Sequence, residues 1–153
     1  MASLKKRAWQ SESGSVLIEA AITMPLLLLV VLGLVDFGRL FQRYEVVTNA
    51  AREGARVAIL PEYDSTDAQH RVEQYITAGG LDPLLVTVTP ITQSVPVGAG
   101  GPCITLRGVT VTYPHTYSFV GGIIQFFGGS GFGTINLTAT ASMRTEGAAG
   151  TCP

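Results

Sequence analysis

The chain has little charge and no basic stripe. Charged residues make up 14% of its 153 residues, and 10 Lys and Arg stand against 11 Asp and Glu, for a formal net charge of −1. A nucleic-acid-binding domain normally carries a basic patch or stripe, so we expect no nucleic-acid partner. The one basic cluster, residues 5–7, directly precedes a polar stretch and a long apolar run, a placement typical of a topology signal.

The chain also lacks the residue patterns of catalytic and metal sites. Neither His70 nor His115 has a second histidine or cysteine beside it at metal-ligand spacing, and we expect both on the surface or in turns. No Gly-x-Ser-x-Gly elbow, Walker A loop or dinucleotide fingerprint occurs. We therefore expect no enzymatic activity, no cofactor, no metal and no small-molecule substrate.

Cysteine is scarce, with Cys103 and Cys152 as the two examples. Both lie far beyond the apolar run, so in an exported segment they would meet an oxidising compartment, where one disulfide can form. Such a bridge would close a loop of about 50 residues and contribute roughly 2 to 4 kcal/mol. Two unpaired thiols are the alternative.

One long hydrophobic run decides the expected topology. Residues 16–35 read VLIEAAITMPLLLLVVLGLV, with Glu19 as their single charge, and about 20 such residues cross a bilayer as a helix. By the positive-inside rule, a leader of residues 1–14 stays in the cytoplasm and the chain after the run is exported. A cleaved secretory signal is the competing interpretation, but no small-x-small cleavage site closely follows the run. We predict a single-pass protein of the cytoplasmic membrane, with its C-terminal domain in the periplasm or at the cell surface.

The membrane helix is expected to continue outside the bilayer. Apolar residues recur there at spacings of three and four, as on one face of a helix. They are Phe37, Leu40, Phe41, Tyr44, Val47, Ala51, Ala55 and Ala58. No proline interrupts this part before Pro61, so one helix is predicted over residues 15–60, membrane-spanning over 16–35 and amphipathic over 36–60. Pro25 is the expected position of a kink.

Residues 61–153 are predicted to form an exported domain, which makes the fold class α+β. Asp64 can cap a short helix that ends at Gly79. Three later segments alternate apolar and polar residues, the pattern of half-buried strands. They are residues 84–89, 104–113 and 134–144. We predict a three-stranded antiparallel sheet with one face on the helices.

Residues 121–133, GGIIQFFGGSGFG, set apolar side chains among glycines. A flexible loop is the simpler interpretation. The alternative is a surface that contacts the membrane or a partner. Its members would be Ile123, Ile124, Phe126, Phe127 and Phe132.

The junction between leader and apolar run holds the clearest local motif, Gly14 followed five residues later by Glu19. It resembles a type IV prepilin processing site, which a membrane-embedded prepilin peptidase cuts on the cytoplasmic side after the glycine. The resemblance implies that Ser15 becomes the first residue. A carboxylate toward the bilayer centre costs about 2.5 to 3.5 kcal/mol, and the new amine would be its natural partner. The alternative is that Glu19 reaches the interface from the end of an ordinary signal anchor.

The whole stretch 14–60 resembles the TadE family, pilin-like proteins of the tight-adherence (Flp) pilus system. The matching pieces, in the family's order, are Glu19, Met24-Pro25, residues 36–39 and residues 49–56. The resemblance implies a minor pilin, or pseudopilin, processed by that system's peptidase and assembled with other pilins and pilus assembly proteins. Removing 14 of 153 residues leaves 139, whereas major pilins of this system are very short. The alternative is a single-pass signal-anchor protein whose exported domain binds a ligand or partner.

Overall fold

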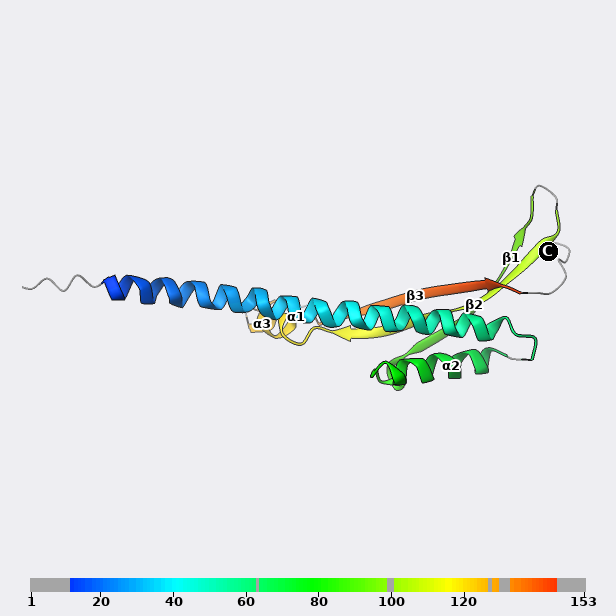
Figure 1. Ribbon diagram of the computed structural model, residues 1–153, viewed down its shortest axis with the longest axis horizontal. Coiled ribbons are helices and arrows are strands. Elements are labelled where there is room, and N and C mark those ends of the chain that lie inside the picture. Colours follow the sequence, from blue (N-terminus) through cyan, green and yellow to red (C-terminus); the bar gives the residue numbers. More distant parts are fainter. Residues whose placement is uncertain (1–11, 63, 99–100, 127, 130–132, 146–153) are drawn as a thin grey trace, which may run out of the picture.

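The computed structural model describes residues 12–62, 64–98, 101–126, 128–129 and 133–145. Its elements, in chain order, are α1 (Glu12–Ala58), α2 (Ser65–Ala78), the 3-10 turn η1 (Pro83–Leu85), β1 (Thr87–Pro96), β2 (Cys103–Thr116), α3 (Val120–Phe126) and β3 (Thr134–Arg144). Figure 1 shows α1 as a long rod, with α2 and the sheet beside its C-terminal half. The predicted α+β architecture is confirmed.

α1 is a single helix of 47 residues that starts three residues before the predicted position. At 1.5 Å per residue its length is about 70 Å. The helix is continuous through Pro25, and its ribbon shows no sharp bend (Figure 1), so the expected kink is absent. The proline therefore removes one backbone hydrogen bond without breaking the helix.

The N-terminal half of α1 is apolar and uncovered. Large side chains such as Leu17, Ile22 and Leu27 are more than 60% exposed, and the most apolar window of the helix is 0% buried. Within the described part of the chain, α1 is the one helix long and apolar enough to cross a membrane. This finding supports a membrane anchor, because lipid tails would cover the surface that the protein leaves open.

The sheet has the order β1-β2-β3, and both neighbouring pairs are antiparallel, as predicted. Its central strand aligns Val111 with Val88 on one side and with Ala139 on the other. β1 begins later than expected, because Leu84 and Leu85 lie in η1. These side chains are 89% and 51% exposed.

One face of the sheet packs against α1 and α2 and forms the hydrophobic core. The buried residues of this core are Val47, Ala50, Ala51, Ala68, Val72, Ile76, Val109, Val111, Tyr113 and Ala139. Small side chains on α1 let this helix approach both α2 and the sheet closely. At Gly54, an added Cβ would lie 2.6 Å from Val72 Cγ2 and 2.9 Å from Val109 Cγ2.

α2 begins with the predicted cap. Asp64 Oδ1 accepts hydrogen bonds from the backbone N–H groups of Thr66, at 2.7 Å, and Asp67, at 3.1 Å. Asp67 Oδ2 accepts in return from the Asp64 N–H at 3.0 Å. This reciprocal capping box fixes the start of the helix, and Gly79 follows its end.

The domain covers the predicted apolar stripe of α1 only in part, and the stripe was expected to pack against either this domain or neighbouring subunits. Its C-terminal members are buried or, at Ala58, half-buried, but Phe37, Phe41 and Tyr44 are 51%, 69% and 48% exposed. The face that meets the domain passes instead through Asp36, which is buried, and Arg43, which is half-buried. Polar contacts to the end of β2 and the start of α3 select this face, and periodicity alone does not reveal them.

The expected flexible loop contains a helix. α3 occupies Val120–Phe126, and the side chain of Ile123 within it is half-buried. Phe127 and Phe132 lie outside the described residues, as do the side chains of Ile124 and Phe126.

Replacing two glycines of α1 separately tests the close packing. Gly38→Ala is expected to be neutral or to stabilise the helix by up to about 1 kcal/mol, because alanine is the better helix former and nothing lies within 4 Å of its Cβ position. Gly54→Ala is expected to lower the free energy of unfolding by about 1 to 3 kcal/mol through overpacking. Denaturant unfolding of the detergent-solubilised protein measures both, and equal stability of the two variants would contradict the packing described.

Candidate processing and assembly site

The three residues of the predicted processing motif lie together at the start of α1. Gly14 is in the first turn of the helix, and the side chains of Ser15 and Glu19 are exposed. Within the described part of the chain, the Glu19 carboxylate has no hydrogen-bond partner, while its backbone carbonyl accepts from Thr23 Oγ1 at 2.8 Å. The carboxylate is therefore open to a partner outside this fold.

Gly14 lies inside α1, although the helix was predicted to begin at residue 15. A peptidase needs an extended substrate, so the first turn has to open before a cut. Glycine weakens a helix by about 1 kcal/mol relative to alanine, and no intrahelical bond holds the first four N–H groups. This turn therefore opens more easily than the interior of α1.

A second, unpredicted site lies one residue beyond the expected membrane span, at Asp36. This carboxylate is 1% exposed. Its Oδ1 accepts from the Ser118 N–H at 3.2 Å, and its Oδ2 accepts from the N–H groups of Phe119 and Val120, both at 2.8 Å. These donors stand at the start of α3, where a helix offers N–H groups without internal partners. A side chain of α1 thereby caps α3 and fixes it in place.

Two neighbours of Asp36 contact the same segment. The ring of Phe37 meets the Tyr117 ring edge-on, with centroids 6.4 Å apart. The guanidinium of Arg39 lies 5.6 Å from the centroid of the Phe119 ring, within the range of a cation–π contact. The family motif at residues 36–39 is thus the part of α1 that holds the segment leading into α3.

His115 belongs to this cluster, and the expectation of a surface or turn position is wrong. It lies in β2 with 2% exposure, and its Nδ1 is 3.1 Å from Arg43 Nη1. Arginine can only donate, so Nδ1 accepts and the ring is neutral, with its proton on Nε2. Nε2 has no hydrogen-bond partner within the described residues. Burial lowers the pKa of His115, and the charge of Arg43 lowers it further, against an opposing effect of Asp36.

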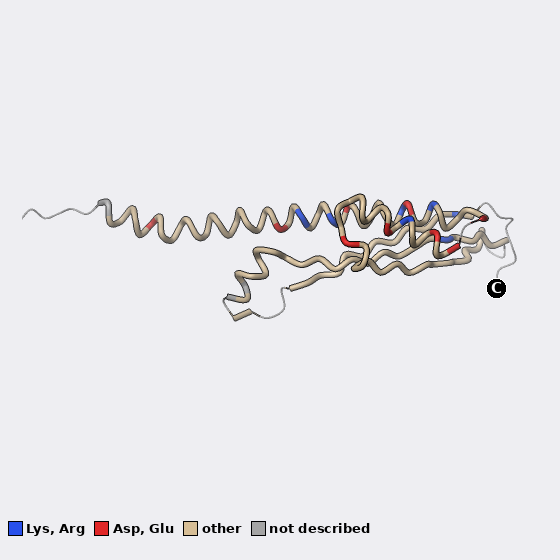
Figure 2. Tube along the Cα trace, turned by 90° about the horizontal axis from the view of Figure 1, so that it is seen from below, with Lys and Arg blue, Asp and Glu red and all other residues tan. Residues whose placement is uncertain are grey.

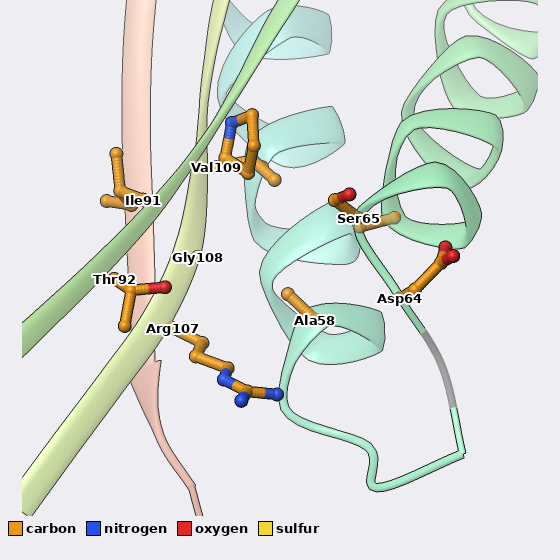
Figure 3. Close-up of a pocket in the computed structure, with 10 residues that line it drawn as sticks. Ala58, Asp64, Ser65, Ile91, Thr92, Arg107, Gly108 and Val109 are labelled. Atoms are coloured by element: carbon orange, nitrogen blue, oxygen red, sulfur yellow. The ribbon is translucent and has the colours of Figure 1, made fainter.

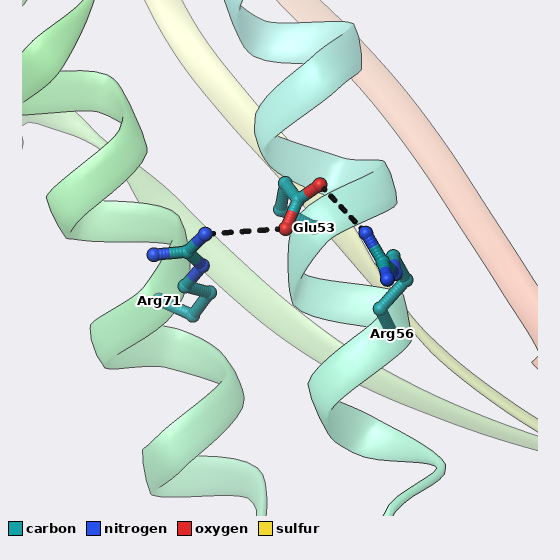
Figure 4. Close-up of polar contacts among 3 residues, drawn as sticks. All are labelled: Glu53, Arg56 and Arg71. Carbon is teal, nitrogen blue, oxygen red and sulfur yellow. Dashed lines mark hydrogen bonds and ion pairs between the residues drawn. The ribbon is translucent and has the colours of Figure 1, made fainter.

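The second family motif, residues 49–56, joins α1 to the rest of the domain. Its small residues lie in the core, and Glu53 forms two ion pairs (Figure 4). Glu53 Oε2 is 3.3 Å from Arg71 Nη2 on α2, and Oε1 is 3.4 Å from Arg56 Nη1. Such partly exposed pairs contribute about 0 to 1 kcal/mol each, and only the Glu53–Arg71 pair joins the two helices, so apolar packing is the main contact that holds α1 and α2 together.

A shallow pocket of about 150 Å³ lies between the end of α1, the start of α2 and the neighbouring strands β1 and β2 (Figure 3). Its one carboxylate, Asp64, is used as the helix cap, and the N–H groups of Asp67 and Thr66 hold the pKa of Asp64 below its ordinary value. Arg107 is the one cation in the lining. The lining therefore offers no pair of groups for acid–base chemistry.

The described residues contain no group of three His, Cys, Asp or Glu side chains that could hold a metal. Cys103 is 6% exposed at the start of β2, whereas Cys152 lies outside the described residues, so the disulfide stays a prediction. The basic residues 5–7 also lie outside the described residues.

Comparison with protein families confirms the resemblance stated from the sequence. The family model described as TadE-like protein matches residues 14–56. The match begins at Gly14 and includes both motifs that hold the domain. Comparisons with curated proteins and with solved structures give no significant match. Residues 14–56 are thus TadE-like, and the rest of the chain lies outside the match.

The pH dependence of stability tests the buried histidine. The pKa of His115 is lowered in the folded state from its ordinary value of 6.5, so below that pH the unfolded chain binds more protons than the folded one. Stability should be full above about pH 6.5 and should fall as the pH drops below that value. Thermal unfolding across this range measures the effect.

His115→Asn should flatten this dependence, because the amide oxygen can still accept from Arg43 and does not titrate. His70→Gln is the matched control, since His70 is exposed on α2, and it should keep the dependence. A wild-type protein that is as stable at pH 5.5 as at pH 7.5 would show that His115 is not buried and neutral.

Proposed function

We propose that this protein is a minor pilin, or pseudopilin, that takes part in the assembly or anchoring of an adhesive tight-adherence pilus. Its partners are the cytoplasmic membrane, other pilins, pilus assembly proteins and a prepilin peptidase. The N-terminus is cytoplasmic, and the domain after α1 is exported. The role is structural, as in TadE-like pilus proteins.

The observation that carries this proposal is that one unbroken helix serves two purposes. The family match covers this helix, whose N-terminal half is apolar and bare and whose C-terminal half forms part of the domain core. A subunit built in this way can leave the bilayer and pack its bare helix against other helices without refolding its domain.

The exposed aromatic residues of α1 provide a further contact surface above the membrane. Phe37, Phe41 and Tyr44 follow one another at helical spacing and face away from the core. Exposed aromatic side chains in a row favour contact with a partner. In the proposed assembly, the helices of neighbouring pilins cover them.

A second candidate function rests on the limit of the family match. The match ends at residue 56, so β1, β2, β3 and α2 lie outside it. The chain would then be a single-pass signal-anchor protein with an exported domain that binds a ligand or a partner. Processing at Gly14 distinguishes the two candidates, because a signal anchor keeps its leader.

The processing test is N-terminal sequencing and intact-mass analysis of membrane-extracted protein, produced with and without the cognate prepilin peptidase. The mature chain should begin at Ser15 when the peptidase is present. Gly14→Leu should block the cut, because a bulky side chain crowds the scissile bond. Gly33→Ala, a change within the open part of the same helix, should not. An unprocessed wild-type chain beside an active peptidase would refute the proposal.

Glu19→Ala separates assembly from processing in the same strains. The variant should insert in the membrane and be cut, but it should assemble poorly, because the new amine loses the carboxylate that pairs with it. Pilus yield is the measurement. Unchanged piliation would count against this pairing while leaving the cleavage result intact.

A further inference from the structure

α3 lies beside the membrane-spanning part of α1 rather than beside the exported part. Figure 1 shows α3 against the N-terminal side of the domain, and Figure 2 shows the same end of the molecule reaching back along the bare helix. An apolar groove of about 560 Å³ separates the two segments. Its walls are Pro25, Leu26, Leu28, Leu29 and Leu32 of α1, opposite Ser118, Phe119, Gly122 and Ile123.

The position of the groove along α1 sets its depth. Its α1 wall lies four to eleven residues before Asp36, which corresponds to about 6 to 16 Å along the helix axis. The whole wall falls inside the span predicted for the bilayer, residues 16–35. Whatever faces it across the groove is therefore at the depth of the lipid tails on the exported side.

The segment around α3 has the composition that such a depth requires. Residues 116–143 contain no Asp, Glu, Lys or Arg, and Figure 2 shows no charged residue on the part of the tube that reaches back along α1. Charged side chains are costly in the hydrocarbon region, so an uncharged stretch of this length is compatible with burial in lipid.

Several backbone N–H groups at the start of α3 are paired within the protein. Unpaired N–H groups are unfavourable in hydrocarbon, and the N–H groups of residues 118–120 all donate to Asp36. Further along, the Ile123 N–H donates to the Phe119 carbonyl at 3.1 Å and the Gly128 N–H to the Gln125 carbonyl at 3.0 Å.

We propose that α3 is a second membrane element, which enters the exported leaflet without crossing it, and that a lipid acyl chain fills the groove between α3 and α1. The inference rests on the membrane anchor of the proposed function. Lipid fits better than a second polypeptide, because one wall is the lipid-facing span itself and the lining has no charged group and a single hydroxyl, that of Ser118, to pair with a partner.

Fluorescence quenching by lipids with brominated acyl chains tests the depth of α3. The sequence has one tryptophan, so Trp9→Phe provides a background without tryptophan. In that background, Ile123→Trp and, as a second reporter in the same wall, Phe119→Trp report on the groove. Leu29→Trp marks the spanning helix. Val97→Trp, in the turn that follows β1 at the far end of the sheet and 53% exposed in the native chain, marks the aqueous side.

In proteoliposomes at low protein-to-lipid ratio, brominated lipid should reduce the emission of Ile123→Trp and Phe119→Trp about as strongly as that of Leu29→Trp. Val97→Trp should keep its emission. If Leu29→Trp is quenched while both groove reporters are not, α3 lies outside the lipid and the inference is overturned, although the anchor stands. If Leu29→Trp is not quenched, the anchor itself fails. Groove reporters whose emission depends on protein density rather than on bromine would reveal a second subunit in the groove and would also overturn the inference.

Discussion

The Asp36 carboxylate is the contact on which the arrangement of this protein depends. It is the point where the C-terminal domain meets the apolar half of α1, and three backbone N–H groups at the start of α3 converge on it. A buried carboxylate is stable when hydrogen bonds to its charge replace those of water. The N–H groups of residues 118–120 therefore stabilise the buried charge of Asp36, and the carboxylate in turn fixes the position of these residues. This contact sets the position of α3 along α1, and the separate contact of Arg43 with His115 lies close by.

The consequence for function is mechanical. The anchor and the domain share one helix, and small residues such as Gly54 bring the sheet and α2 tightly onto its C-terminal half. Movement of the helix therefore moves the domain with it. In the proposed pilus assembly, such a rigid connection would present the bare helix and the exposed aromatic residues to neighbouring subunits in a fixed orientation.

Local sequence patterns were sufficient to predict the helices and strands that depend on the spacing of neighbouring residues. The apolar run predicted the membrane helix, the alternation of threonine with apolar residues predicted the strands, and Asp64 predicted the start of α2. The contact of Asp36 with residues 118–120 joins positions more than 80 apart in the chain, which no period or spacing encodes. The placement of α3 beside α1 depends on that distant contact, and the burial of His115 beside Arg43 is a second contact between residues far apart in the chain. The one available signal was an acidic residue at the edge of the span, inside a family motif.

Amide hydrogen exchange at residues 118–120 of the detergent-solubilised protein tests the central contact most directly. Loss of the acceptor leaves N–H groups without partners, at a cost of about 1 to 3 kcal/mol. Asp36→Ala should therefore speed exchange at these amides by roughly tenfold to a hundredfold. Asp64→Ala, which removes an equivalent cap from α2, should leave exchange there unchanged and speed it at the start of α2 instead. Equal protection of residues 118–120 in the wild type and in Asp36→Ala would contradict the account.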